Sequence, residues 1–316
     1  MRVSLASLAL LIAPITAIAA QPLTIGVAPK AKDSPYWNVV KGGVMKAKAD
    51  LEAQGVTVNI LWDAPAREDQ TEEQKQVVAS FVAKKVDAIV LAPSSAQILA
   101  PAADQAKAAG IPVVVIDSLI NTESPVSVVA TNNYKAGLLA GRRIAEVLNG
   151  NGNVALFRFV KGHGSTQPRE SGFLDALKKF PGIKVISSDF ISGATKEEAQ
   201  KNANALLQKF GAELNAVFAP NLPSSEGMLA ALRDTKLAGK IAFVGFDSTD
   251  ELVDGLRKGE LAGLTVQQPF RMGYLGVTSA VAAAQKKAVE KEVDTEVMMV
   301  TKDNLDTPEV KKLLNP

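Results

Sequence analysis

The sequence predicts an α/β protein with two lobes, each built on a parallel sheet. Short apolar runs such as "VDAIVLAP" and "IPVVVID" alternate with segments in which apolar residues recur at spacings of three and four. Continuous apolar strands separated by helices are typical of parallel sheets covered on both faces. The 316 residues are also more than one hydrophobic core usually serves, so two lobes are the default.

An internal repeat favours two sheets over a single barrel. "VDAIVLAPSS" is followed by a helical pattern, a glycine and "IPVVVIDS", and "LNAVFAPNLPSS" is followed in the same way by "KIAFVGFDS". The two units end at Asp117 and Asp247, which fits two Rossmann-like lobes. Since β–α units resemble one another in general, the repeat alone leaves the barrel open.

The expected elements follow from these patterns in chain order. Strands are expected at 23–29, 56–62, 86–93, 111–117, 153–160, 183–190, 214–220, 240–247 and 261–266. Helices are expected from the "SPYW" that begins at Ser34, and at 68–85, 95–110, 196–211 and 224–239.

The first 20 residues are typical of a secretory signal peptide. Arg2 supplies a basic start, an apolar stretch follows, and "AIA" at 17–19 fits the small-residue cleavage pattern. The apolar stretch is shorter than the roughly 20 residues of a spanning helix, so a retained membrane anchor is the less favoured alternative. The mature protein is therefore expected to be soluble and exported.

Composition excludes several classes of function. There is no cysteine, which excludes disulfides and thiolate metal sites, and His163 as the only histidine cannot form a zinc site by itself. A net charge of +2 without a basic run argues against nucleic acid as a partner. "GHGS" at 162–165 lacks the third glycine of a dinucleotide site, and neither a phosphate loop nor a Gly-x-Ser-x-Gly elbow occurs. We expect no enzyme activity, no cofactor and no metal, and we interpret His163 as a surface loop residue.

Polar side chains gather where the expected strands end, and in open α/β sheets ligands bind beyond those ends. The residues in question are Lys30, the Tyr36–Trp37 pair, Asp117, Asn221, Asp247, Gln267 and Gln268, with Arg169 at the start of a helix. Carboxylates, amides and basic groups suit the hydroxyls of a polyhydroxylated ligand, and aromatic faces suit the C–H surface of a sugar.

The charges of these residues cancel, because Lys30 and Arg169 balance Asp117 and Asp247. A neutral ligand would then leave no unpaired charge in the closed site, although a zwitterion such as an amino acid meets the same condition. Each residue also has a structural interpretation. Either aspartate could cap the next helix, Arg169 could be solvated, and Tyr36 and Trp37 could belong to the core.

In this order and spacing, "SPYW", "VIDS", "TNNYKAG", "PRESGF", "APN", "VGFDSTDEL" and "VQQP" resemble the periplasmic sugar-binding proteins of the ribose/allose/galactose type, which feed ABC importers. The resemblance covers nearly all of the chain after residue 20. It implies two lobes joined by a three-segment hinge near 131–132, 267–268 and 296–297. The N-terminal lobe would comprise 21–131 and 268–296, and the C-terminal lobe 132–267 and 297–316.

The resemblance also implies a ligand-binding set of nine residues: Lys30, Ser34, Tyr36, Trp37, Asp117, Arg169, Asn221, Asp247 and Gln267. Two positions depart from the ribose-type members. Ser118 stands where they have arginine, and "ISGAT" at 191–195 stands where they have an aromatic residue. A hexose, ketose, polyol or inositol is therefore as plausible as a pentose.

The expected function is capture of a neutral monosaccharide or polyol and its delivery to the membrane permease of an ABC importer, by a monomer. The alternative is a sensing protein that presents a bound small molecule to a chemoreceptor or sensor kinase. A sugar-responsive repressor would need a DNA-binding segment before residue 23, where the signal peptide lies instead.

Overall fold

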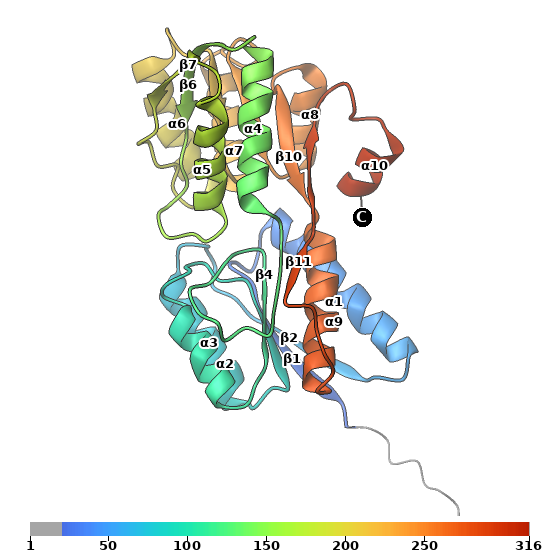
Figure 1. Cartoon of the computed structure of the whole chain (residues 1–316). Coiled ribbons are helices and arrows are strands. Elements are labelled where there is room, and N and C mark those ends of the chain that lie inside the picture. Colours follow the sequence, from blue (N-terminus) through green and yellow to red (C-terminus); the bar gives the residue numbers. More distant parts are fainter. Residues whose placement is uncertain (1–20, 316) are drawn as a thin grey trace, which may run out of the picture.

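Two six-stranded sheets, one in each of two α/β lobes, form the framework of the protein (Figure 1). This computed structural model describes residues 21–315, so the expected signal peptide lies outside the described residues. The two lobes and their mostly parallel sheets confirm the predicted fold class. The strands are mostly apolar, because helices cover both faces of each sheet. Strands β3 (Ala88–Leu91) and β4 (Val113–Ile116), for example, are buried along their whole length.

The two sheets share one strand order. The first contains, in spatial order, β2 (Val58–Trp62), β1 (Leu23–Ala28), β3, β4, β5 (Ser127–Ala130) and β11 (Glu292–Asp294). The second contains β7 (Gly182–Ser187), β6 (Asn151–Leu156), β8 (Ala216–Phe218), β9 (Ala242–Phe246), β10 (Gly263–Gln267) and β12 (Val297–Val300). The chain order therefore reverses at β1 in the first sheet and at β6 in the second. Such a reversal point is where doubly wound sheets bind ligands.

Strand β12 departs from the predicted parallel arrangement. It pairs antiparallel with β10, with Leu264 opposite Val300, whereas β11 is parallel to β5. The chain leaves the first sheet at the end of β11 and enters the second at the start of β12, after two intervening residues. It therefore runs away from the lobe junction in β12, whereas β10 runs toward it. Three short strands, β5, β11 and β12, were not expected from the sequence.

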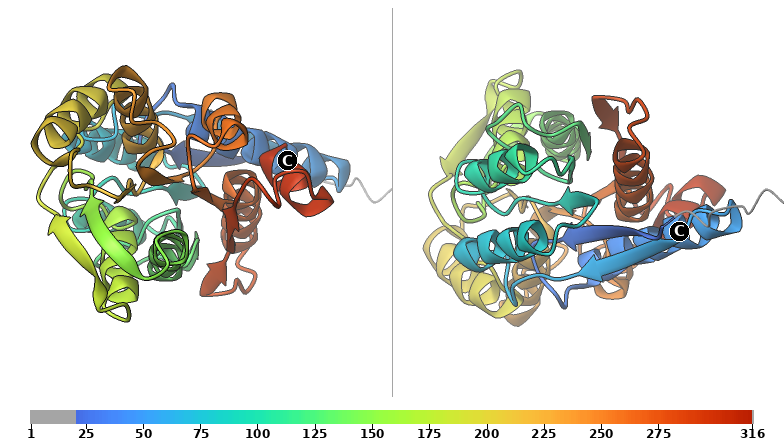
Figure 2. Two further views of the ribbon diagram at one scale, coloured as in Figure 1. Left: turned by 90° about the horizontal axis from the view of Figure 1, so that it is seen from above. Right: turned by 90° about the horizontal axis from the view of Figure 1, so that it is seen from below.

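Helices cover both faces of each sheet (Figure 2). In the first lobe, α1 (Pro35–Ala53) and α9 (Pro269–Ala284) pack together on one face, and α2 (Thr71–Ala83) and α3 (Ala100–Ala108) on the other. In the second, α4 (Asn133–Val147) packs on α5 (Thr166–Leu177), and α6 (Lys196–Phe210) packs on α7 (Leu222–Asp234), which also contacts α8 (Asp250–Lys258). The short α10 (Pro308–Leu314) ends the chain. Helix α2 was expected to begin at 68 but begins at Thr71, after the charged turn "RED". Helix α3 was expected to begin at 95 but begins at Ala100, directly before a proline.

The chain crosses between the lobes three times. After β5 it enters α4 of the second lobe, after β10 it enters α9 of the first, and after β11 it enters β12. In Figure 1 the three crossings lie together at the junction of the lobes. Each lobe is thus built from separate stretches of sequence.

Candidate ligand-binding site between the lobes

A cavity between the two lobes gathers all nine residues expected to bind ligand. It is lined by Lys30, Ser34, Tyr36, Trp37, Glu68, Asp117, His163, Ser165, Thr166, Arg169, Asn221, Leu222, Pro223, Asp247 and Gln267. The volume is about 30 Å³. One water needs roughly 10–15 Å³ by this measure, so the cavity in this closed arrangement holds a few waters rather than a sugar.

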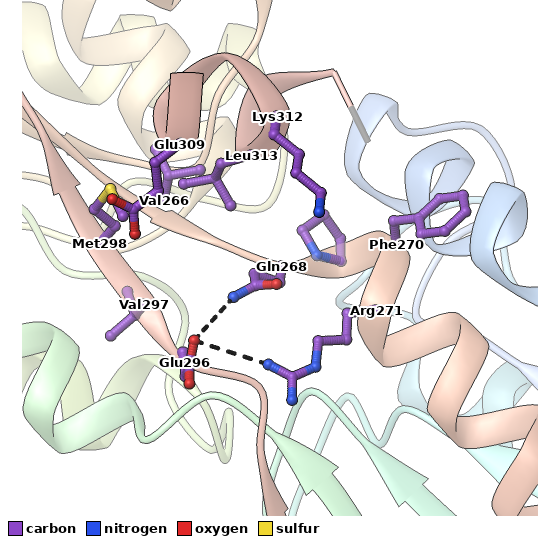
Figure 3. Close-up of a pocket in the computed structure, with 11 residues that line it drawn as sticks. Val266, Gln268, Phe270, Arg271, Glu296, Val297, Met298, Glu309, Lys312 and Leu313 are labelled. Carbon is purple, nitrogen blue, oxygen red and sulfur yellow. Dashed lines mark hydrogen bonds and ion pairs between the residues drawn. The ribbon is translucent and has the colours of Figure 1, made fainter. Parts of the chain in front are cut away.

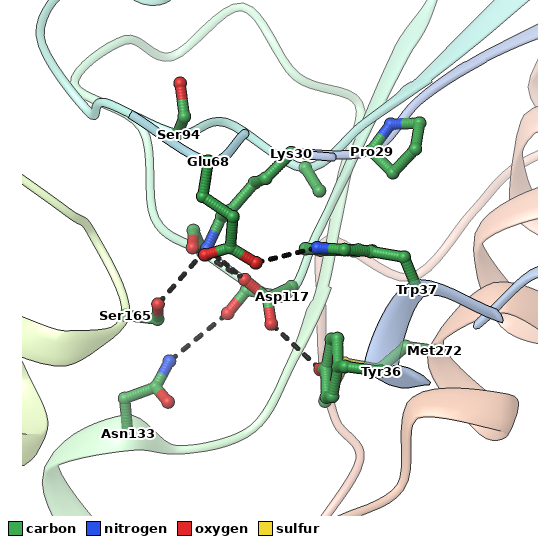
Figure 4. Close-up of polar contacts among 12 residues, drawn as sticks. Pro29, Lys30, Tyr36, Trp37, Glu68, Ser94, Asp117, Asn133, Ser165 and Met272 are labelled. Carbon is green, nitrogen blue, oxygen red and sulfur yellow. Dashed lines mark hydrogen bonds and ion pairs between the residues drawn. The ribbon is translucent and has the colours of Figure 1, made fainter. Parts of the chain in front are cut away.

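Lys30 and Asp117 form the centre of the first-lobe side (Figure 4). Lys30 Nζ lies 2.6 Å from Asp117 Oδ2, and both side chains are almost fully buried. Asp117 Oδ2 also accepts a hydrogen bond from Ser118 (2.8 Å), and Oδ1 accepts one from the Tyr36 hydroxyl (2.9 Å). This aspartate therefore anchors the first-lobe side rather than capping a helix.

Asp117 and Asp247 occupy matching positions with matching backbone geometry. They follow β4 and β9 directly, and their φ angles are 66° and 67°. Non-glycine residues rarely adopt this left-handed conformation, and Asp is among those that tolerate it best. The helix cap after β9 is Thr249, which leaves the Asp247 carboxylate free to face the cavity. The repeated "IDS" and "FDS" of the sequence thus correspond to two equivalent turns.

Arg169 orders the second-lobe side. Its guanidinium donates to Asn133 Oδ1 (2.7 Å), to the carbonyl oxygen of Pro220 (3.0 Å) and to Gln267 Oε1 (2.9 Å), and it lies 3.8 Å from the ring centre of Phe246. Gln267 in turn donates to Asp247 (2.7 Å). Arg169 is 2% exposed, so it is not a solvated helix residue.

Two helix N-termini bring further polar groups to the cavity. Asn221 caps α7 in a reciprocal arrangement with Ser224, which occupies its side-chain oxygen and leaves its amide N–H groups for a ligand. Ser34 precedes α1 with extended backbone, and its hydroxyl makes no capping bond. Pro35 then starts the helix with its fixed φ.

The Tyr36–Trp37 pair forms one wall of the cavity. Their rings are 5.0 Å apart at 87°, an edge-to-face arrangement. The indole N–H of Trp37 donates to Glu68 Oε1 at 2.7 Å. Each aromatic side chain therefore combines a ring face with a hydrogen bond to a carboxylate, which a core residue would not need.

Burial and charge give the two aspartates different pKa values. Burial works to raise the pKa of Asp117, but the positive charges of Lys30 and Arg169 outweigh it and lower that pKa to about 2. Burial raises the pKa of Asp247 to about 6, although Arg169 and the Gln267 hydrogen bond oppose this. Burial, with the negative charge of Asp117, also raises the pKa of Tyr36 well above its usual value, so Tyr36 remains a donor.

Six cavity residues were not expected from the sequence: the apolar Leu222 and Pro223, and the polar Glu68, His163, Ser165 and Thr166. The interpretation of His163 as a surface residue was wrong, since it is 3% exposed and packs edge-to-face on Phe159. Burial, together with the charge of Lys30, lowers the pKa of His163 to about 3, so the imidazole is neutral. The charge balance inferred from the sequence was also incomplete, because Glu68 adds a third carboxylate against two cations.

Gln268 does not join the cavity, which corrects its expected place beside Gln267. Neighbouring residues of an extended segment face opposite ways. Gln268 points to Glu296 in a separate cavity of about 380 Å³ between α10 and the lobe junction (Figure 3). There Arg271 also lies 3.8 Å from Glu296.

Direct contacts hold the lobes together around the site. Lys30 Nζ of the first lobe lies 3.3 Å from Ser165 Oγ of the second. The Ala96 amide donates to the carbonyl oxygen of Gly162 (3.3 Å). The arrangement is therefore closed, with the cavity enclosed by both lobes.

Among residues 21–315, no cluster of three or more His, Asp or Glu side chains is suited to hold a metal ion. Within the same part of the chain, no helix combines the length and apolar character needed to cross a membrane.

The sequence and the fold are both similar to those of known binding proteins. The family model described as "Periplasmic binding protein domain" matches residues 25–288. A ribose import binding protein of Bacillus subtilis is 29% identical over 282 residues, covering 88% of this chain and 87% of the relative. A carbohydrate transporter solute binding protein from Agrobacterium radiobacter, in complex with D-arabinose, has a TM-score of 0.88 at 32% identity and covers 94% of this chain and 100% of its own. An ABC transporter solute binding protein from Agrobacterium vitis with bound D-fucose has a TM-score of 0.87 at 33% identity, covering 92% and 99%.

Proposed function

The chain belongs to the periplasmic binding protein domain family, and from this premise we propose that it captures a neutral monosaccharide or polyol between its lobes and delivers it to the membrane permease of an ABC importer. It acts in the periplasm as a monomer, after removal of the signal peptide at 1–20. The ribose-binding name of the relative in B. subtilis and the D-arabinose and D-fucose in the similar structures support a sugar as the ligand.

The observation that carries this proposal is the composition of the cavity between the lobes. It combines carboxylates, amide and basic donors, and an aromatic wall, and both lobes contribute. Asp247 accepts hydrogen bonds from ligand hydroxyls, Asn221 donates, and the Tyr36–Trp37 wall covers the C–H surface of the ring. The nine residues expected to bind ligand keep that role in the proposal.

Binding is coupled to a hinge motion. The lobes, 21–131 with 268–296 and 132–267 with 297–316, open and close about the segments near 131–132, 267–268 and 296–297. A sugar stabilises the closed form only through contacts that it makes with both lobes at once. The closed form is then the state that the permease recognises, and an empty open form does not trigger transport.

The site binds and does not catalyse. His163 and Ser165 are close in sequence, but among residues 21–315 no hydrogen bond joins the imidazole to the Ser165 hydroxyl, which instead faces Lys30. With its pKa lowered to about 3, the His163 imidazole is too weak a base to activate a nucleophile.

A thermal-shift screen of protein unfolded and refolded to remove any carried ligand tests the proposal. The panel contains D-ribose, D-arabinose, D-galactose, D-fucose, D-allose, D-tagatose, xylitol and myo-inositol, with amino acids as controls. A ligand at 100 times its Kd adds about 2.7 kcal/mol, which raises the Tm by several degrees. We expect a large shift from one carbohydrate. If no carbohydrate raises the melting temperature and an amino acid does, the result would contradict the proposal.

A further inference from the structure

Glu68 lies in the loop between β2 and α2, and it is the one carboxylate of the cavity that neither the strand ends nor the family resemblance pointed to. Its neighbours Arg67 and Asp69 turn outward and pair with each other at 2.7 Å. Glu68 turns inward between them, where its Oε1 accepts the indole N–H of Trp37. Figure 4 shows its carboxylate beside Lys30 and Asp117. The loop therefore places this group in the cavity with a fixed orientation.

The acceptor capacity of the first-lobe carboxylates is unequal. Asp117 already accepts from Lys30, Ser118 and Tyr36, and a carboxylate offers about four acceptor positions. Among the described residues, Glu68 accepts only the Trp37 indole. Most of its acceptor capacity is thus free and faces the cavity.

Glu68 matches Asp247 of the second lobe in this respect. Asp247 accepts from the neutral amide of Gln267, as Glu68 accepts from a neutral indole. Burial raises the pKa of both groups, as expected for carboxylates that lack a direct cationic partner. Each lobe therefore presents one carboxylate whose remaining hydrogen bonds must come from outside the protein.

We propose that Glu68 is a ligand-binding and specificity-determining residue: its carboxylate accepts a hydrogen bond from one hydroxyl of the bound sugar or polyol, and Trp37 positions it. This inference rests on the proposed function. It makes Glu68, rather than the nearly saturated Asp117, the main hydroxyl acceptor of the first lobe. The ligand must then carry a hydroxyl directed at this loop as well as those directed at Asp247.

The test is isothermal titration calorimetry on refolded wild type and E68Q. The parent ligand is whichever of the eight carbohydrates in the thermal-shift panel binds the wild type most tightly, and it is compared with each of its mono-deoxy analogues. A hydrogen bond to a charged group contributes about 1.5–3 kcal/mol, which is roughly a 10- to 150-fold change in Kd. We expect the substitution E68Q to raise the Kd of the parent ligand by this factor. Removing one particular hydroxyl from the ligand should raise the Kd for the wild type by a similar factor. The same removal should raise the Kd for E68Q by less than threefold.

Two further variants separate recognition from folding. E73Q, which changes an exposed glutamate on α2, should leave every Kd within twofold of wild type. W37F keeps a ring but removes the N–H that holds Glu68, so it should reduce discrimination at the same deoxy position. The melting temperature of ligand-free E68Q should equal or exceed that of the wild type, because a partly buried carboxylate with a raised pKa is replaced by a neutral isostere.

The outcomes distinguish this inference from the function on which it rests. If the parent binds wild type and E68Q with Kd values within twofold, or if both rank the deoxy analogues alike, Glu68 does not contact the ligand and only this inference is wrong. If none of the eight carbohydrates of the thermal-shift panel binds the wild type, the proposed function fails and the inference fails with it. If the wild type distinguishes the parent ligand from one deoxy analogue and E68Q does not, the result supports both the proposed function and the role of Glu68.

Discussion

Arg67 of the first lobe and Glu198 of the second form an ion pair of 3.0 Å between the lobes. Both side chains are more than two-fifths exposed, and Arg67 also pairs with Asp69 in its own loop. The Arg67–Glu198 pair exists only while the lobes are closed, because its two members belong to different lobes. It therefore favours closure without touching the cavity.

Breaking this pair should weaken binding modestly. Exposed ion pairs contribute about 1 kcal/mol or less, so R67M should raise the Kd of a sugar by no more than about fivefold. The effect should shrink in high salt, which screens exposed charges. Titration calorimetry at low and high salt measures this. A loss of 100-fold or more would show that Arg67 acts on the ligand rather than on closure.

Replacing Lys30 should destabilise the ligand-free protein strongly. K30M leaves the buried Asp117 without its cation, and such uncompensated charges cost about 3–5 kcal/mol. The double variant K30M/D117N removes the unpaired charge and should recover part of the loss. Urea unfolding at pH 7 compares the three proteins. A K30M protein as stable as the wild type would contradict the buried ion pair.

The stability of the protein should depend on pH through Asp247. Its pKa is about 6 in the folded protein and about 3.9 in an unfolded chain, so between these values the folded state binds more protons. The free energy of unfolding therefore falls as the pH rises from about 4 to about 6, by about 3 kcal/mol at most. Asp117, with its lowered pKa of about 2, acts in the opposite sense and only below about pH 4.

The comparison of wild type with D247N isolates this effect. The difference in unfolding free energy between them should change across pH 4–6 and stay constant above pH 7. Sugar affinity should rise with pH near 6, because hydroxyl donors favour the ionised carboxylate. A difference between the two proteins that does not vary with pH would contradict the raised pKa of Asp247.

Two adjacent glycines of α1 should respond oppositely to alanine. A Cβ on Gly43 would lie 1.9 Å from the backbone oxygen of Phe270, so G43A must push α1 away from α9. This should cost about 1–3 kcal/mol or more. A Cβ on Gly42 would meet only the Phe270 ring at 3.5 Å, so G42A should be neutral or stabilise by up to about 1 kcal/mol. Equal effects in chemical unfolding would contradict this close helix packing.

Strand ends could be predicted from the sequence because each is marked by an apolar run followed by a polar residue. In parallel sheets such ends meet at one edge, which is why Lys30, Asp117, Asn221 and Asp247 reach one cavity. Gln268 shows the limit of this reasoning, since the alternation of an extended chain turns it to the other side of the junction.

The remaining cavity residues gave no comparable signal. Glu68 lies six residues after β2 in the charged stretch "AREDQ", where a solvated loop is the usual outcome, and only its hydrogen bond to Trp37 reveals its inward orientation. His163 lies in a glycine-rich loop that is buried because the first lobe closes over it, and a contact between lobes is not visible in a local pattern.

The central claim is that a sugar bridges the lobes and closes them, and small-angle X-ray scattering measures it most directly. The refolded protein should be recorded without ligand and with a saturating amount of the carbohydrate that gives the largest thermal shift. We expect the radius of gyration to decrease on binding, toward that of the closed arrangement in Figure 1, whose cavity of about 30 Å³ must widen to admit a sugar. An identical radius in both states, with binding verified by calorimetry, would contradict capture by hinge closure.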